Sequence, residues 1–314
     1  MNSATKKTAS TEESTQGGGR VSIRHLIVWP AIYLLMRMAA PFIQLPNPAL
    51  GNIVATVVFL LLPLLWLREI SRNPPRARIA LPVFLILALI WGELLLGMPF
   101  GVLRHINWHH HLYAARFMLL FARPMADLAL ITAAAVMGTL VAKVISDPKM
   151  LLPVAVVGAL VDYWGVYMGT TSAFIKASPD FVRAVSAGIP SFGGGLTQRG
   201  VQPASFVGFG DWLFLTMFLA VAFRYDLQPR RTFWALLAFL VPAMLIVIFG
   251  GLDYLPAIVP MALAIVCVNG KKLKMSRSEA FATFYALLMV LAMVGVYALV
   301  TGHTQHPLPP TGGK

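Results

Sequence analysis

The sequence predicts an all-α membrane protein that crosses the bilayer several times, and two observations support this prediction. Hydrophobic residues make up 58% of the 314 residues and charged residues only 12%, and the mean hydropathy is +0.75. Apolar stretches of about 20 residues, the length a helix needs to cross a hydrocarbon core of about 30 Å, recur along the chain. Such a composition excludes a soluble globular domain.

Nine of these stretches are predicted to span the membrane. They lie at about residues 25–44, 49–68, 79–102, 125–145, 151–169, 205–224, 232–250, 253–269 and 280–300. The segment 106–122 has a short apolar part that Arg116 interrupts, so we expect an interfacial helix there instead. The long connection 170–204 is predicted to be a mobile loop over one face of the bundle.

Positive charges predict the orientation of these helices. With nine spans and a cytoplasmic N-terminus, the basic connections 68–78, 224–231 and 271–277 and the short turn 147–149 all lie in the cytoplasm. A tenth span at 106–122 would move two of the three basic connections outside. We therefore expect a cytoplasmic N-terminus and an outside C-terminus.

The chain divides into four regions on these grounds. Residues 1–20 form a polar, glycine-rich tail that is expected to be disordered, and 21–150 form an N-terminal helical membrane region. Residues 151–269 form a core that contains two intramembrane acids, and 270–314 form a C-terminal helix and tail.

Charge and cysteine content exclude several partners and cofactors. The net charge of +13 is spread over short connections rather than one basic domain, so we expect the lipid bilayer as a partner and no nucleic acid. The single cysteine, Cys267, excludes an intramolecular disulfide and is predicted to be buried. The adjacent side chains of His109, His110 and His111 would point in different directions on a helix, so neither a metal nor an organic cofactor is expected.

Two aspartates within apolar helices are the candidate functional residues. Asp162 lies in LLPVAVVGALVDYWGVYMG, and Asp211 ends a Gly208-Phe209-Gly210-Asp211 turn. A carboxylate in hydrocarbon costs several kcal/mol and marks a functional site by default. The two predicted helices are consecutive and antiparallel, with both acids about 9–11 Å below the outer surface at 1.5 Å per residue. We therefore expect the two carboxyl groups to face each other.

Such a pair has a defined chemistry. Two carboxyl groups in contact share one proton, so the ionised member takes a proton from water while the neutral member polarises a peptide carbonyl. Gly208 and Gly210 lack side chains and would let an extended substrate or a facing helix approach. The two prolines in Pro256–Pro260 leave backbone groups unpaired, so this segment is expected to be strand-like and to bind a substrate backbone by strand addition.

In this order and spacing, the motifs over residues 150–269 resemble the intramembrane aspartyl proteases: presenilin, signal peptide peptidase and their microbial homologues. The residues after Asp162 and the inferred orientation are more similar to signal peptide peptidase than to presenilin. The resemblance implies a peptidase that cleaves transmembrane segments. By position it implies a catalytic pair, Asp162 and Asp211, two residues that shape the site, Gly208 and Gly210, and a substrate-positioning segment, Pro256, Ala257 and Ile258.

This sequence differs from the family pattern at three points. Val161 replaces the tyrosine before the first aspartate, Ile258 replaces the leucine of the Pro-Ala-Leu motif, and an additional helix at 280–300 follows the motif helix.

Two other functions fit the same acids. A proton-coupled transporter or channel would use Asp162, Asp211 and Glu93, an acid in the middle of the third predicted helix with no place in the protease motif. The simplest role for Glu93 is a neutral acid hydrogen-bonded between helices. A peptidase of the prepilin-processing type would favour a basic residue soon after the Gly-Asp turn, and none occurs in Asp211-Trp-Leu-Phe-Leu.

Overall fold

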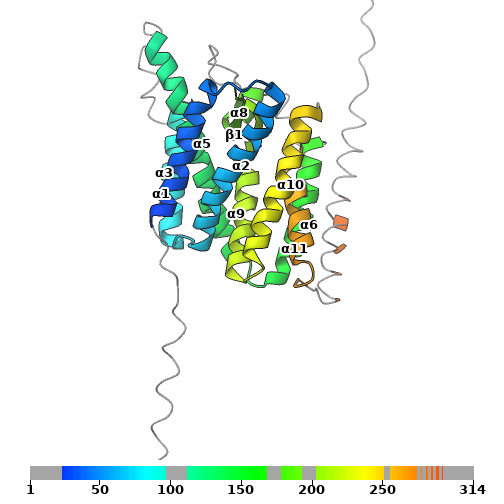
Figure 1. Cartoon of the computed structure of the whole chain (residues 1–314). Coiled ribbons are helices and arrows are strands. Elements are labelled where there is room, and N and C mark those ends of the chain that lie inside the picture. Colours follow the sequence, from blue (N-terminus) through cyan, green and yellow to red (C-terminus); the bar gives the residue numbers. More distant parts are fainter. Residues whose placement is uncertain are drawn as a thin grey trace, which may run out of the picture.

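The chain forms a bundle of apolar helices with a small two-stranded sheet (Figure 1). A computed structural model describes residues 23–96, 112–167, 178–192, 203–250 and 255–273, with single helical positions between 277 and 292. The α-helices are α1 (Ile23–Ala39), α2 (Pro48–Arg72), α3 (Ala77–Leu96), α5 (Leu112–Val144), α6 (Leu151–Tyr167), α8 (Pro179–Ala184), α9 (Phe209–Arg224), α10 (Pro229–Gly250) and α11 (Ile258–Asn269). The strands are β1 (Ser186–Pro190) and β2 (Pro203–Gly208), and two 3₁₀ turns are η1 (Ala40–Phe42) and η3 (Pro148–Met150).

Six helices in the described part of the chain are long and apolar enough to cross a membrane. They are α1, α2, α3, α5, α6 and α10, where α1 and α6 include their adjoining 3₁₀ turns. Leucine and isoleucine side chains on α3 are exposed, among them Ile79, Leu81, Leu85 and Ile86. An apolar exposed face is what a lipid-facing helix requires. The chain is therefore a predominantly helical, multi-pass membrane protein.

These six helices are fewer than the nine spans that the sequence predicts. Helix α9 has 16 residues and α11 has 12, which gives lengths of about 24 and 18 Å at 1.5 Å per residue, shorter than the hydrocarbon core. Residues 251–254 and most of 280–300 lie outside the described residues, as does the tail 1–20. The count of nine remains a prediction.

Helix α5 is longer than expected. The sequence predicts a span at 125–145 and a separate interfacial helix at 106–122, but Leu112–Val144 is one continuous helix of 33 residues. Pro124 lies inside it. The side chain of Arg123 forms an (i, i+4) ion pair with Asp127, which stabilises the helix where the sequence suggested a break.

A hairpin-like pair of strands replaces part of the predicted loop 170–204. Strands β1 and β2 pair in an antiparallel sheet, and the short helix α8 precedes β1. The prediction of a helix from residue 205 is wrong, because 203–208 are extended and α9 begins at Phe209. Backbone pairing satisfies polar groups that would otherwise be costly in an apolar bundle.

Helix α9 lies at the centre of the bundle. It packs against α2, α5, α10 and α11, and the residues from Leu215 to Ala222 are all buried. The closest approach is at Gly138 of α5, where an added Cβ would lie 2.4 Å from the carbonyl oxygen of Leu213. Only glycine allows α5 and α9 to pack this closely. By contrast, Cys267 on α11 is exposed rather than buried as predicted.

The basic connections lie together at one end of the bundle. The Lys143 ammonium at the end of α5 donates to the carbonyl of Pro75 between α2 and α3 at 2.6 Å. Lys272, after α11, donates to the carbonyl of Asp226 between α9 and α10 at 3.2 Å. Cationic side chains thus connect neighbouring turns at this end.

Candidate active site

Asp162 connects α6 to the start of α11. Its side chain is partly buried five residues before α6 ends, and its Oδ2 accepts a hydrogen bond from the backbone N–H of Ile258 at 2.9 Å. The two residues are 96 positions apart in the chain. The structure therefore brings together the first predicted acid and the last residue of the Pro256-Ala257-Ile258 segment.

A glycine one turn before Asp162 lets three helices meet. An added Cβ at Gly158 would lie 3.3 Å from the ring of Phe214 on α9 and 3.6 Å from Cγ2 of Ile258 on α11. The first of these distances is tighter than an ordinary contact. Gly158 thus allows α6 to approach α9 and α11 just beside the first acid.

Asp211 is fixed at the beginning of α9. It is the third residue of the helix, and its Oδ2 accepts a hydrogen bond from the backbone N–H of Gly208 at 3.0 Å. An acid at this position stabilises the helix N-terminus by satisfying an unpaired N–H and by complementing the helix dipole. The side chain remains partly buried. The capping geometry fixes where this carboxyl group sits.

The two acids lie near each other without a cationic partner. Asp162 is close enough for its charge to act on Asp211. Each carboxyl group accepts one backbone N–H, and neither forms an ion pair with any residue that the structure describes. The arrangement leaves carboxylate oxygens available for a water or a substrate.

The depth expected for Asp211 from a helix starting at residue 205 is not supported. Asp211 lies in the first turn of α9, and the extended strand β2 precedes it. Its position within the helix therefore does not give its depth in the membrane. Proximity to Asp162 comes instead from the packing of α6 against α11 and of both helices near α9.

The two glycines before Asp211 have different surroundings. An added Cβ at Gly208 would lie 3.4 Å from Oδ2 of Asp211, whereas one at Gly210 would have no described atom within 4 Å. Gly210 is also exposed. The open space beside Asp211 is therefore on the Gly210 side.

The segment Pro256-Ala257-Ile258 is not strand-like, which corrects one expectation. Ala257 has helical dihedral angles, φ −74° and ψ −20°, and caps α11. The N–H of Val259 donates to the carbonyl of Pro256 at 3.3 Å. The prolines thus begin a helix, and the first free N–H of that helix is the one that Asp162 accepts.

A further intramembrane acid, Asp127, which sequence reasoning did not single out, has different surroundings. Asp127 on α5 is 1% exposed and forms ion pairs with Arg37 of α1 at 3.1 Å and with Arg123 at 3.0 Å. The backbone N–H of Gly188 on β1 also lies close to this carboxyl group. The one local signal was the (i, i+4) spacing of Arg123 and Asp127.

This ion-paired cluster, Arg37, Asp127 and Arg123, holds β1 in place. Arg123 donates from Nη2 to the carbonyl oxygens of Arg183 and Ser186, both at 2.7 Å. Ser186 pairs with Gly208, the residue whose N–H binds Asp211. The cluster therefore supports the Asp211 turn through the β-sheet.

The other predicted residues lie apart from the two acids or outside the described structure. Glu93 lies on α3, is partly buried and interacts with another residue. His109, His110 and His111 lie outside the described residues. Within the described ranges, no three His, Cys, Asp or Glu side chains are grouped so as to hold a metal ion.

Comparisons with known proteins do not identify a relative. No family model, curated protein or solved structure matches the chain. The candidate site therefore rests on its own residues and geometry.

Proposed function

We propose that the chain is an intramembrane aspartic endopeptidase that hydrolyses peptide bonds in transmembrane segments, with Asp162 and Asp211 as the catalytic pair. The resemblance to presenilin and signal peptide peptidase motivates the proposal. Its main structural support is the hydrogen bond from the Ile258 N–H to Asp162, because it joins two motifs that the resemblance assigns to one site. The third motif, at Asp211, lies within electrostatic reach.

The proposed reaction needs only a water and the two carboxyl groups. The ionised carboxylate removes a proton from water as the water oxygen bonds to the peptide carbonyl carbon, and the neutral carboxyl donates a hydrogen bond to the carbonyl oxygen. The C–N bond then breaks, and the amine leaves with a proton from the carboxyl pair. No metal or organic cofactor takes part.

A helical substrate must unwind before this reaction, because its carbonyl groups are hydrogen-bonded within the helix. The open space beside Gly210 is where we place the unwound segment. Gly208 and the Pro256–Ile258 segment border the same acids and would position it.

The proposed topology has nine spans, a cytoplasmic N-terminus and an outside C-terminus. The grouping of basic connections at one end of the bundle supports it, because such an end faces the cytoplasm in most membrane proteins. A C-terminal tag that is accessible only from the cytoplasm would overturn this topology.

The test is hydrolysis of a single-span fluorogenic peptide by the purified protein in liposomes. We expect two products whose masses add up to the substrate plus one water, and loss of both products with Asp162→Asn or Asp211→Asn. Asp226→Asn is the matched control: Asp226 lies in a turn joining α9 to α10 with φ 49°, a conformation that asparagine tolerates well. Cleavage that survives either dyad substitution would reject the proposal.

The same liposomes distinguish the transporter alternative. A pH-sensitive dye inside them would report proton uptake that depends on Asp162, Asp211 and Glu93. Proton uptake without cleavage would replace the protease proposal with transport.

A further inference from the structure

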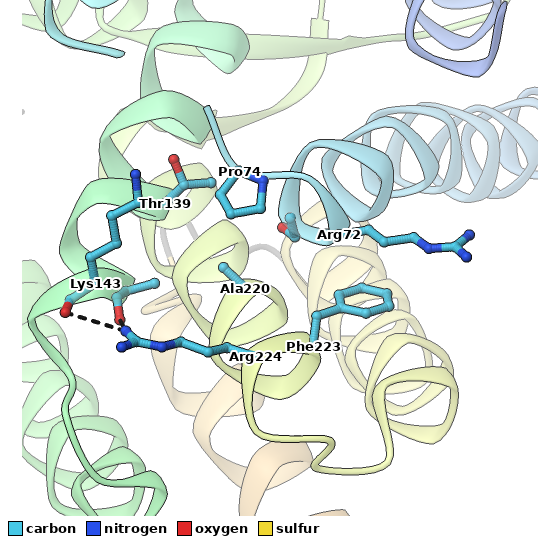
Figure 2. A pocket seen from close by; sticks show the side chains of 9 residues that line it. Arg72, Pro74, Thr139, Lys143, Ala220, Phe223 and Arg224 are labelled. Carbon is cyan, nitrogen blue, oxygen red and sulfur yellow. Dashed lines mark hydrogen bonds between the residues drawn. The ribbon is translucent and has the colours of Figure 1, made fainter. Parts of the chain in front are cut away.

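The end of the bundle opposite the two acids contains an unassigned cavity of about 300 Å³. The ends of α2, α5 and α9 surround it (Figure 2). Its lining includes three cationic residues, Arg72, Lys143 and Arg224, and no acidic residue is among the described residues that line it. Such a cavity selects for an anion.

The cavity has an apolar wall as well as a cationic rim. Ala220 and Phe223 of α9 line it together with Pro74 after α2. In Figure 2, the guanidinium of Arg224 reaches the backbone carbonyl of Lys143, the ammonium of Lys143 points towards Thr139 and Pro74, and Arg72 projects outward from α2. A ligand with an anionic group for the cationic rim and an apolar part for the apolar wall would fit this cavity.

The cations keep hydrogen-bond donors for a ligand. Lys143 has three N–H donors, and one of them reaches the Pro75 carbonyl. Arg224 directs Nη1 at the carbonyls of Ala142, Lys143 and Ile145, each at 3.3 Å, and its Nη2 and Nε groups bind no acceptor among the described residues. Arg224 thereby caps the end of α5, and its remaining N–H groups can donate to a ligand in the cavity that it lines.

We propose that this cavity binds the phosphate of an anionic lipid headgroup. The cavity lies where α2, α5 and α9 end, among the basic connections at that end of the bundle. The ends of membrane-spanning helices lie near the bilayer surface, where lysine and arginine attract anionic headgroups. The phosphate lies against the cationic rim formed by Arg72, Lys143 and Arg224, and the glycerol and acyl parts lie along Phe223. The inference is independent of the proposed protease activity.

The test compares two double variants that remove the same charge. The cavity pair is R72Q/K143Q, and the control pair, R230Q/K271Q, removes two exposed cations from the same end of the bundle but not from the cavity lining. Arg224 is left intact because it caps α5. Phosphatidylglycerol binding to full-length protein is measured by native mass spectrometry and by titration in phosphatidylcholine nanodiscs.

We expect a saturable site for phosphatidylglycerol that R72Q/K143Q weakens by about tenfold or more, because the phosphate loses two of its three cationic contacts and a hydrogen bond to a charged group contributes about 1.5–3 kcal/mol. R230Q/K271Q and the conservative K143R should stay within about twofold of the unmodified protein. Equal weakening by both double variants would show general surface attraction and overturn the proposal. Competition by inorganic phosphate would assign the site to free phosphate, whereas its failure to compete would assign it to lipid.

Discussion

Two regions of this bundle hold intramembrane carboxyl groups in opposite ways. Around Asp127, two arginines form ion pairs at 3.1 and 3.0 Å, and the carboxyl group is 1% exposed. Around Asp162 and Asp211, each carboxyl group accepts a single backbone N–H, and no described cation pairs with either.

The difference separates a structural acid from reactive ones. A carboxylate paired with two arginines is charge-compensated, and at 1% exposure the Asp127 carboxylate is closed off from a substrate. A carboxylate held by one amide is fixed in position but keeps lone pairs and can exchange a proton with a neighbour. The first region anchors β1, and the second is suited to acid–base chemistry.

The largest stability effect is expected for Asp127→Asn. It leaves the buried Arg37 and the partly buried Arg123 without a counter-charge, and breaking a buried ion pair such as Arg37–Asp127 in this way costs about 3–5 kcal/mol. The free energy of unfolding in detergent micelles measures this loss. A variant as stable as the unmodified protein would remove the distinction between the two regions.

A smaller loss is expected for Gly138→Ala, because α5, which carries Asp127, packs at this glycine against α9, which carries Asp211. The new Cβ would lie 2.4 Å from the carbonyl oxygen of Leu213, and such overpacking costs about 1–3 kcal/mol. Gly250→Ala is the control, because its Cβ would make an ordinary 3.5 Å contact with Ile246. Equal unfolding midpoints for the two variants would contradict this packing.

Gly210→Ala should leave folding unchanged and reduce cleavage. Its Cβ would enter space with no described atom within 4 Å, so the free energy of unfolding should shift by less than about 0.5 kcal/mol. If the substrate backbone occupies that space, the KM for the span peptide rises. An unchanged KM would place the substrate elsewhere.

The smallest effect is expected for Glu93→Gln. Glu93 lies on α3, which packs mainly against α5, and it already interacts with another residue. We expect cleavage within about twofold of the unmodified protein, because the proposed reaction needs only two carboxyl groups. Loss of cleavage comparable to Asp211→Asn would favour a proton relay through α3.

Part of this organisation could be predicted from sequence because it depends on local pattern. Apolar length predicted most helices, and the basic residues predicted which connections share one end. The resemblance assigned Asp162 and Pro256–Ile258 to one site, and in the structure the backbone N–H of Ile258 donates a hydrogen bond to Asp162.

The remaining features depend on contacts between distant residues. Arg37 and Asp127 are 90 positions apart, so no local sequence pattern predicts their ion pair. Strand β1 is buried at all five positions, and without polar alternation its sequence does not resemble a half-exposed strand. Helix α5 continues past Arg123 because Asp127 and backbone carbonyls bind that arginine.

The most direct test is cleavage per folded molecule for Asp211→Asn and Asp127→Asn, measured side by side with the span peptide in liposomes. We predict that Asp211→Asn folds normally and loses cleavage by about a thousandfold, as expected for removal of a general acid–base group. We predict that Asp127→Asn yields less folded protein, but that each folded molecule keeps a measurable fraction of the cleavage rate. Normal cleavage by folded Asp211→Asn would contradict the division between the two regions.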